Sequence, residues 1–337
     1  MSRPRLTIVS IADARFLPGL VVAVSSAMAA ASGATDYRFL ILDGGLTTDS
    51  VEKLSHVVRR IAGEKRVEAT VELQAVNPAR LQTLPERRGS RMTYAKMVLP
   101  EILPEEESIV YLDADVLCFA GIEAVRPPAG AEGRWLLAGA RDYFGVIEKD
   151  CPWIDQVRPA ERKLPYINCG VMWMNLARLR DMDFTGRSIE ARAAAGNARQ
   201  GDQSVFNFLC RGKSFILPDS INHCTAIGSA RPLCEGNMNL NLHYIGSPKP
   251  WLGPPRTSNW LAHQLWHQAA AAISAEEIPL PIFAPPYDRR QIWLKSWLYT
   301  VTNPGRAAQY RSDLRSLKDP GEVLAKGRAR WCGRSGI

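Results

Sequence analysis

The sequence of this 337-residue chain lacks several features that would classify a protein at once. No Cys-x-x-Cys pair occurs among its seven cysteines, and Cys118 and Cys169 lie in apolar runs, as is typical of free buried thiols in a reducing compartment. The Ala- and Ser-rich segment Leu17–Ala31 is shorter than the roughly 20 apolar residues that span a bilayer. No Gly-x-Gly-x-x-Gly follows a strand-like segment, so a dinucleotide fold of that type has no support. We therefore expect a cytoplasmic protein.

An excess of charge is also missing from most of the chain. The net charge is +8, but eleven Lys/Arg and four Asp/Glu follow residue 285, which assigns +7 to this C-terminal segment and +1 to the rest. With 46% hydrophobic and 23% charged residues, the composition is that of a globular protein and excludes disorder, collagen and coiled coil. Because the basic excess lies outside the main domain and no recognised module is visible, we expect no nucleic-acid partner.

Strand-like and helix-like segments alternate through the first half of the chain. Short apolar segments near residues 6–11, 37–43, 67–73 and 109–119 are separated by helix-like stretches near 18–31, 50–61 and 94–103. This alternation predicts an α/β fold with a mostly parallel central sheet flanked by helices. Ligands bind at the carboxyl ends of the strands in such sheets. Asp13, Asp43 and the pair Asp113 and Asp115 all fall at or just after strand ends, so we expect them at this rim.

The pair Asp113 and Asp115, in the segment IVYLDADVLCF, is the strongest local signal. Two carboxylates separated by one residue bind a hard divalent cation such as Mg²⁺ or Mn²⁺ through oxygen. Two unit charges 4 Å apart repel by about 4 kcal/mol at an effective dielectric near 20, and a bound cation offsets that repulsion. The alternative interpretation is that the carboxylates cap the next turn or pair with arginine.

A second group of polar residues lies in LHYIGSPKPW, residues 242–251. His243 follows a strand-like stretch, Gly246 permits close approach of the backbone to a ligand, and Lys249 supplies a point charge suited to phosphate. An isolated histidine is usually structural. Combined with the aspartate pair, however, this group indicates a metal–diphosphate site.

Two further segments interrupt otherwise apolar stretches. Asn168 and Gly170 stand within YINCGVMWMN, and Asp202 and Gln203 follow Gly201 at the start of a predicted helix. From sequence alone, Asp202 is expected to be the N-cap of that helix.

In this order, the segments resemble the family 8 glycosyltransferases, retaining enzymes that use nucleotide-sugar donors, and among them the bacterial lipopolysaccharide galactosyl- and glucosyltransferases. The matching residues lie between about 5 and 255, and they are Ala12-Asp13, Thr93-Tyr94-Ala95-Lys96, Tyr111-Leu112-Asp113-Ala114-Asp115, Asn168-Cys169-Gly170, Asp202-Gln203 and residues 243–251. The resemblance implies a GT-A fold for a catalytic domain over residues 1–285. It also implies transfer of glucose or galactose from a UDP-sugar to a saccharide or glycolipid acceptor.

The resemblance also implies roles for individual residues. Asp113, Asp115 and His243 would bind Mn²⁺ or Mg²⁺. The UDP-sugar would contact Ala12, Asp13, Asp113, Ala114, Asp115, Gly246 and Lys249. The catalytic residues around the donor sugar would be Lys96, Asp142, Asn168, Asp202 and Gln203. The chain departs from the family pattern at Arg15, Lys96 and Cys169, where uncharged polar, arginine and small residues are usual, and none of these changes removes a metal ligand.

Three questions stay open at this stage. A haloacid dehalogenase-type phosphatase also has a strand that ends in Asp-x-Asp, but it normally has threonine or valine where Leu117 stands, and GDQSVF at 201–206 lacks its later acidic pair. A non-catalytic nucleotide-sugar-binding protein is the other alternative. For an enzyme, retention of the anomeric configuration would proceed either by double displacement through Asp202 or Gln203, or by a front-face route.

The basic C-terminal tail, residues 286–337, has two interpretations. Its basic residues are interleaved with aromatic ones, Trp293, Trp297, Tyr299 and Tyr310. This composition suits peripheral contact with the anionic inner face of the cell membrane. The other interpretation is a solvated helix packed on the catalytic domain.

Overall fold

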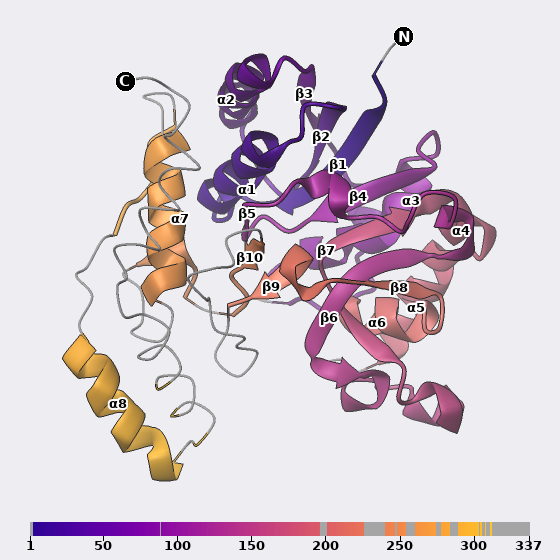
Figure 1. Ribbon diagram of the computed structural model, residues 1–337. Coiled ribbons are helices and arrows are strands. Elements are labelled where there is room, and N and C mark those ends of the chain that lie inside the picture. The colour runs from indigo at the N-terminus through magenta and orange to yellow at the C-terminus, as the bar shows by residue number, and fades with distance from the viewer. Residues whose placement is uncertain are drawn as a thin grey trace.

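The computed structural model describes residues 3–87, 89–195, 201–225, 240–246, 248–253, 260–273, 278–283, 289–302, 304, 307 and 311. Its centre is a seven-stranded sheet with the order β3-β2-β1-β4-β7-β6-β8 (Figure 1). The strands are β1 (Arg5–Ala12), β2 (Asp36–Asp43), β3 (Ala69–Gln74), β4 (Ser108–Leu112), β6 (Leu137–Val146), β7 (Pro165–Asn175) and β8 (Ser214–Leu217).

This sheet is mostly parallel, as the strand–helix alternation predicts. Strands β3, β2, β1 and β4 pair in parallel, β8 pairs in parallel with β6, and β7 runs antiparallel to both of its neighbours, β4 and β6. Residues 147–164 return the chain from β6 to β7, and an antiparallel pair needs no helical crossover. The GT-A-type α/β fold expected for the chain is therefore present, with β7 as the reversed strand.

Helices cover both faces of the sheet and form a hydrophobic core on each (Figure 1). One core contains α1 (Leu17–Ala30) and α2 (Thr48–Lys65), and the other contains α3 (Leu99–Ile102), α4 (Leu176–Asp181), α5 (Phe184–Ala194) and α6 (Asp202–Leu209). Successive β4 residues alternate between them: Val110 and Leu112 enter the first core, and Ile109 and Tyr111 enter the second. Burial on both faces explains why β4 is an uninterrupted apolar run.

The apolar segment 109–119 was expected to be one strand, and that expectation is wrong. The chain leaves the main sheet after Leu112, and after the turn at 113–115 it enters a second sheet of order β5-β10-β9. This sheet comprises β5 (Val116–Cys118), β9 (His223–Cys224) and β10 (Asn241–His243). In the antiparallel β10–β5 pair, His243 lies opposite Val116, next in the chain to Asp115. The strand pairing therefore brings His243 to the aspartate turn.

The helix expected over 94–103 is also different in the structure. Residues Met92–Val98 form a 3₁₀ helix, η2, and α3 begins only at Leu99. Pro100 then lies in the first turn of α3, where its missing N–H is not needed, whereas it would break a helix that ran through it.

The C-terminal part of the described chain contains two longer helices. Helix α7 (Trp260–Ile273) packs against α1, and its Trp266 contacts Trp251 with ring centroids 5.6 Å apart. Helix α8 (Arg289–Thr302) belongs to the predicted tail, of which residues 303–337 lie outside the described residues except for 304, 307 and 311. Within the described ranges, no helix is both long and apolar enough to cross a membrane.

Candidate active site

Polar side chains from both sheets meet where β1 and β4 end, and they line one pocket. Every residue that the sequence placed in the site lines this pocket except Asp142: Ala12, Asp13, Lys96, Asp113, Ala114, Asp115, Asn168, Asp202, Gln203, His243, Gly246 and Lys249. Asp142 on β6 is buried behind it, where its Oδ2 accepts hydrogen bonds from Asn168 Nδ2 (2.8 Å) and Gln203 Nε2 (3.2 Å).

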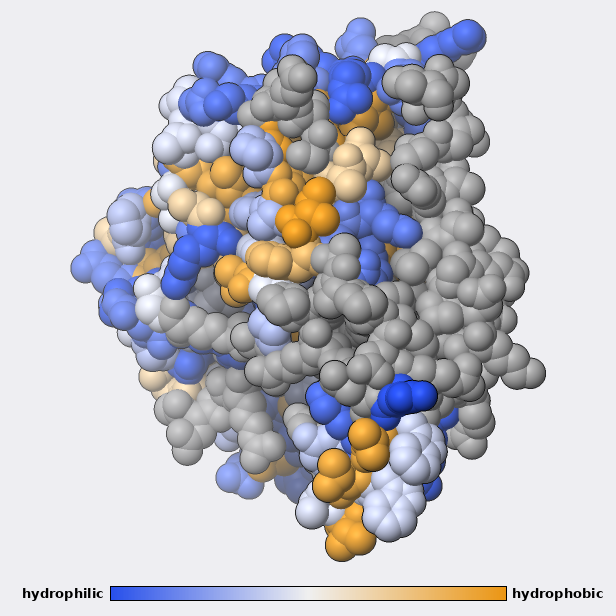
Figure 2. All heavy atoms as spheres, turned by 90° about the vertical axis from the view of Figure 1, so that its left-hand side faces the viewer, coloured by the Kyte–Doolittle hydropathy of each residue, from blue (hydrophilic) through white to orange (hydrophobic). Residues whose placement is uncertain are grey.

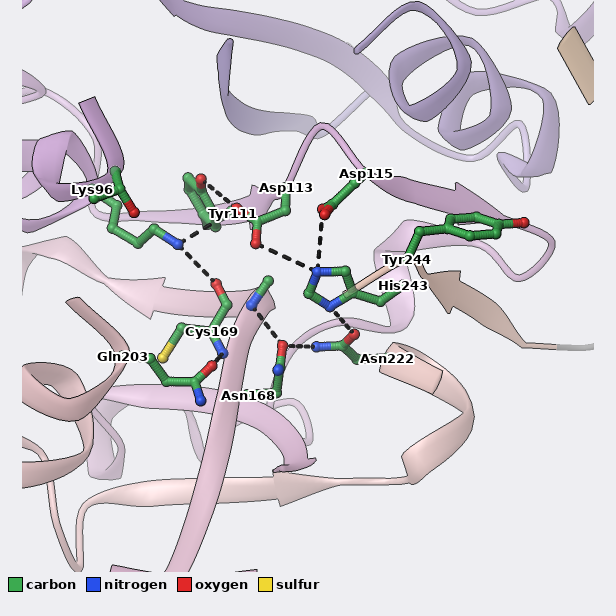
Figure 3. A network of polar contacts seen from close by, with 12 residues as sticks. Lys96, Tyr111, Asp113, Asp115, Asn168, Cys169, Gln203, Asn222, His243 and Tyr244 are labelled. Atoms are coloured by element: carbon green, nitrogen blue, oxygen red, sulfur yellow. Dashed lines mark hydrogen bonds and ion pairs between the residues drawn. The ribbon is translucent and has the colours of Figure 1, made fainter. Parts of the chain in front are cut away.

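The candidate metal ligands Asp113, Asp115 and His243 form one compact group (Figure 3). Each offers a ligand atom, and the three atoms lie within 4.8 Å of one another. His243 Nε2 lies 3.2 Å from Asp115 Oδ1 and 3.6 Å from Asp113 Oδ2. Burial disfavours the charged imidazole, but the Asp115 carboxylate outweighs it and raises the pKa of His243 to about 10. The ring therefore carries the positive charge that two adjacent carboxylates require.

Asn222, a residue that the sequence did not single out, orients the His243 ring (Figure 3). Its Oδ1 accepts a hydrogen bond from His243 Nδ1 at 3.0 Å, and its Nδ2 donates to Asn168 Oδ1 at 2.8 Å. This pairing turns Nε2 toward the two carboxylates. Asn222 lies in a short 3₁₀ helix, Asp219–Asn222, and no spacing to the other polar residues would have revealed it in the sequence.

Lys249 pairs with the carboxylate oxygen of Asp115 that His243 does not contact. Its Nζ donates to Asp115 Oδ2 and, at 2.7 Å, to the carbonyl of Tyr244. Burial alone would raise the pKa of Asp115, but Lys249 and His243 overcome that effect and hold it below its usual range. An ammonium group has three N–H donors, so one remains for a ligand oxygen in the pocket.

Lys96 occupies the equivalent place beside Asp113. Its Nζ lies 3.5 Å from Asp113 Oδ1, 2.9 Å from Asp202 Oδ2 and 4.4 Å from the centroid of the Tyr111 ring. Although burial lowers the pKa of Lys96, the carboxylates of Asp113 and Asp202 raise it above its usual value, so the ammonium stays charged.

Tyr111 donates its hydroxyl to Asp113 Oδ1 at 2.7 Å. Tyr111 lies in β4, and Asp113 directly follows its last residue, so the alternation of side chains along the strand already indicates that the two leave the chain on the same face. Burial raises the pKa of Asp113, and nearby Lys96 lowers it only in part.

The expected catalytic residues Asp202 and Gln203 are both held in place. Gly201, not Asp202, is the N-cap of α6, and the Asp202 carboxylate instead pairs with Lys96 and accepts a hydrogen bond from Thr93 Oγ1 at 3.2 Å. The N-cap interpretation is therefore wrong. Gln203 Oε1 accepts from the backbone N–H of Cys169 at 2.9 Å, and its Nε2 donates to Asp142, so both ends of this amide are used within the protein.

Asp13, expected at the nucleoside, is engaged by its neighbour Arg15. Asp13 Oδ2 accepts from Arg15 Nη2 (2.8 Å) and Nε (3.2 Å), and Oδ1 accepts from the backbone N–H of Arg15 and Phe16. Arg15, which departs from the family pattern, therefore binds the Asp13 carboxylate directly and holds it in place at the pocket.

The donor set suits a divalent cation. Two carboxylates and an imidazole are ligands that Mn²⁺ accepts, and the ring's second nitrogen is held by Asn222, as ligating histidines usually are. Glycine at position 170 leaves space for the three ligand side chains. A Cβ atom there would collide with the His243 ring and lie 2.9 Å from Asp113 Oδ2. Asp113, Asp115 and His243 therefore fit a metal.

Comparison with known proteins agrees with this geometry. The family described as Glycosyl transferase family 8 matches residues 7–253. A "Probable galacturonosyltransferase-like 10" of Arabidopsis thaliana is 27% identical over 71% of this chain and 69% of its own length. A "Putative glycosyltransferase" of Haemophilus influenzae is 24% identical over 48% of this chain, which spans 49% of that relative.

Solved structures show the same fold. The galactosyltransferase LgtC, in complex with donor and acceptor sugar analogs, is 24% identical and superimposes with a TM-score of 0.64 over 81% of this chain and 98% of its own. The glycosyltransferase GlyE of Streptococcus pneumoniae is 17% identical, with a TM-score of 0.57 over 80% of this chain and 60% of its own. With a family match over most of its length and the fold of these enzymes, the chain belongs to glycosyltransferase family 8.

Proposed function

We propose that this protein transfers a hexose, galactose or glucose, from a UDP-sugar to a saccharide or glycolipid acceptor, as in lipopolysaccharide biosynthesis. Mn²⁺, or Mg²⁺ in its place, would be held by Asp113, Asp115 and His243 and would offset the negative charge of the donor diphosphate. The observation that carries the proposal is the compact group of three ligand atoms with Lys249 beside it. The membership in family 8 replaces the phosphatase interpretation and leaves a non-catalytic nucleotide-sugar binder as the alternative.

The residues of the pocket supply most of the chemistry. When bound, the metal would act as a Lewis acid toward the leaving diphosphate. The remaining N–H donor of Lys249 would bind a phosphate oxygen and stabilise the charge that develops there. Asp13 and Arg15, at the rim, would position the nucleoside. The pairing of Lys96 with Asp202 orients that carboxylate within the same pocket.

Asp202 is better placed than Gln203 for a double displacement. Its carboxylate lines the pocket and is held from one side by Lys96 and Thr93, whereas the Gln203 amide is used at both ends within the protein. If Asp202→Ala and Gln203→Ala both keep near-normal turnover, the covalent route through either residue is excluded and the front-face route remains.

Galactose is the first donor sugar to test. The names of two similar proteins, a galactosyltransferase and a "Probable galacturonosyltransferase-like 10", refer to sugars of the same ring configuration. Discrimination between glucose and galactose depends on one hydroxyl and the few contacts made to it.

The test is calorimetric titration of UDP into the full chain with and without Mn²⁺, for wild type, Asp115→Asn and the control Asp43→Asn. Asp43 also ends a strand, but it lies outside this pocket, and asparagine retains the Oδ1 atom that accepts from Gly45 and Leu46. We expect binding that needs both the metal and Asp115 and that the control keeps. Binding independent of both would refute the proposed site. Tight binding without turnover of UDP-galactose or UDP-glucose across an acceptor panel would favour the non-catalytic alternative.

A further inference from the structure

Asp142 was expected among the catalytic residues, but it lies behind the pocket and not in its lining. Its Oδ1 accepts a hydrogen bond from the backbone N–H of Phe144 at 3.1 Å. Its Oδ2 accepts from Asn168 Nδ2 at 2.8 Å and from Gln203 Nε2 at 3.2 Å. These three partners are all N–H donors of the protein. Asp142 can therefore act on the site through the groups that it orients.

The first of these groups is the amide of Asn168. A carboxylate only accepts hydrogen bonds, so Asn168 presents Nδ2 to Asp142 and turns Oδ1 to the other side. There, Oδ1 accepts from the backbone N–H of Gly170 at 2.9 Å and from Asn222 Nδ2 at 2.8 Å. A reversed amide would set its oxygen against the carboxylate and its NH₂ group against two N–H donors. The observed orientation is therefore favoured at both ends.

Asn222 transmits this orientation to the metal ligand His243 (Figure 3). Because Asn222 Nδ2 donates to Asn168, its Oδ1 faces the ring, 3.0 Å from His243 Nδ1. That ring nitrogen must then carry a hydrogen, since the amide oxygen can only accept. Nε2, which faces Asp113 and Asp115, is left as the nitrogen available to a cation.

Asp142, Asn168 and Asn222 thus form a hydrogen-bonded relay to the metal site, and all three are buried. They are 5%, 4% and 2% exposed, respectively. On the outside of the molecule, by contrast, hydrophilic side chains reach solvent among hydrophobic ones (Figure 2). A polar group at the surface can replace a lost partner by water, whereas a buried one is left without a partner. A change at Asp142 is therefore expected to alter the whole relay.

We propose that Asp142 is a positioning residue for the metal site. Through Asn168 and Asn222, it sets the direction of the hydrogen bonds that keep His243 Nε2 turned toward the cation. This role differs from contact with the donor sugar, which the family resemblance implies for Asp142. It deepens the proposed function and rests on it, since His243 is a ligand only where a metal binds.

Mn²⁺ titration of the full chain in the presence of UDP, followed by electron paramagnetic resonance of the free ion, distinguishes the two roles. UDP carries no sugar, so a residue that only contacts the donor sugar cannot change this affinity. Asp142→Ala is expected to weaken Mn²⁺ binding about tenfold, the lower end of the effect of losing a group that orients a ligating histidine. Asp142→Asn should restore most of the affinity, because its amide oxygen still accepts from Asn168.

Asp150→Ala is the matched control. Asp150 is also buried, at 6% exposed, and it accepts from the hydroxyls of Tyr166 at 2.7 Å and Ser204 at 2.6 Å, outside the relay. The control should lose stability in urea unfolding but keep the metal affinity of the wild type. If Asp142→Ala does not fold, Asp142→Leu takes its place, because leucine has the same branching without an acceptor.

The double variant Asp142→Ala with Asn222→Ala separates a relay from two independent effects. Without Asn222, the orientation of Asn168 has no path to the ring, so the double variant should bind Mn²⁺ about as weakly as Asn222→Ala alone. Losses that multiply overturn the proposal, and so does wild-type metal affinity in Asp142→Ala. A loss confined to binding of the UDP-sugar would make Asp142 a sugar contact instead.

A measurement without metal separates this role from the proposed function. In the metal-free wild type, the Nδ1 proton of His243, assigned with a His243→Gln variant, should exchange slowly with water by nuclear magnetic resonance. In Asp142→Ala, exchange should be about tenfold faster or more, because the ring is less firmly held. If the wild type binds no metal, the proposed function fails, and this exchange rate alone decides on the relay. Equal rates in the two proteins overturn it.

Discussion

Replacing Asn222 by alanine should weaken metal binding without touching a metal ligand. Asn222 is 2% exposed, and it connects His243 Nδ1 to Asn168 Oδ1 through hydrogen bonds of 3.0 and 2.8 Å. In the variant, the imidazole loses the partner that keeps Nε2 directed at Asp113 and Asp115. The ring can then rotate, so that only a fraction of the molecules has the three ligand atoms within 4.8 Å of one another at any time.

The expected losses in metal affinity and in stability follow from what each lost contact contributes. Loss of a residue that orients a ligating histidine typically costs about 10–100-fold in metal affinity, or about 1.4–2.7 kcal/mol. A separate loss of about 1–3 kcal/mol in unfolding free energy is expected, because Asn168 Oδ1 and His243 Nδ1 lose a buried partner. Asn222→Asp should restore most of the metal affinity, since it keeps the acceptor for Nδ1.

The assay is Mn²⁺ titration in the presence of UDP, followed by electron paramagnetic resonance of the free ion, together with urea unfolding. Asn207→Ala is the matched control, because Asn207 is also a buried asparagine and bonds to the backbone of Ile167, at 2.7 and 2.8 Å, away from the ring. The control should lose stability but keep metal affinity. Wild-type metal affinity in Asn222→Ala would refute the argument that this residue orients His243.

Two more predictions follow from buried contacts. Gly170→Ala should abolish metal-dependent UDP binding in calorimetry, since the new Cβ would collide with the ligand ring, whereas Gly133→Ala, with no atom within 4 Å of its added Cβ, should bind normally. His263 and His267 are buried on α7, and burial lowers the pKa of each from 6.5 to about 4. Their stabilising contribution should be complete above pH 6.5 and lost as the pH falls toward 4, by up to about 3 kcal/mol for His263 and by less for the more solvent-screened His267. Urea unfolding at several pH values should show this slope, and His263→Phe with His267→Phe should flatten it; an unchanged slope contradicts the assignment.

The sequence predicted the members of the site better than the path of the chain around it. Asp113 and Asp115 were recognisable because carboxylate spacing and strand-end position are local patterns, and the resemblance to family 8 added His243; the structure brings the three together. The reversed direction of β7 was not predictable, because a strand buried on both faces has the same apolar pattern whether it runs parallel or antiparallel.

Roles that depend on tertiary contacts were not predicted from the sequence, for a related reason. Asn222 occupies an ordinary turn, and its importance arises only when β9 and β10 place it beneath the His243 ring. Asp202 had the local pattern of a helix cap, but the ammonium of Lys96, distant in the sequence, outweighed that local preference. The contact of Tyr111 with Asp113, in contrast, could be inferred from the sequence, since Tyr111 lies in the strand that leads into the aspartate turn, two positions before Asp113.

The break between β4 and β5 also has a thermodynamic consequence. Asp113 follows the last residue of a strand in the large sheet, and Asp115 precedes the first residue of a strand in the small one. A cation that binds both carboxylates would therefore act as a crosslink between two sheets, and its binding free energy would be shared with their association. By mass action, saturating metal and UDP should raise the temperature at which this junction melts. Hydrogen exchange at β5 and β10 should then slow on binding more than at β2, which has no part in the crosslink.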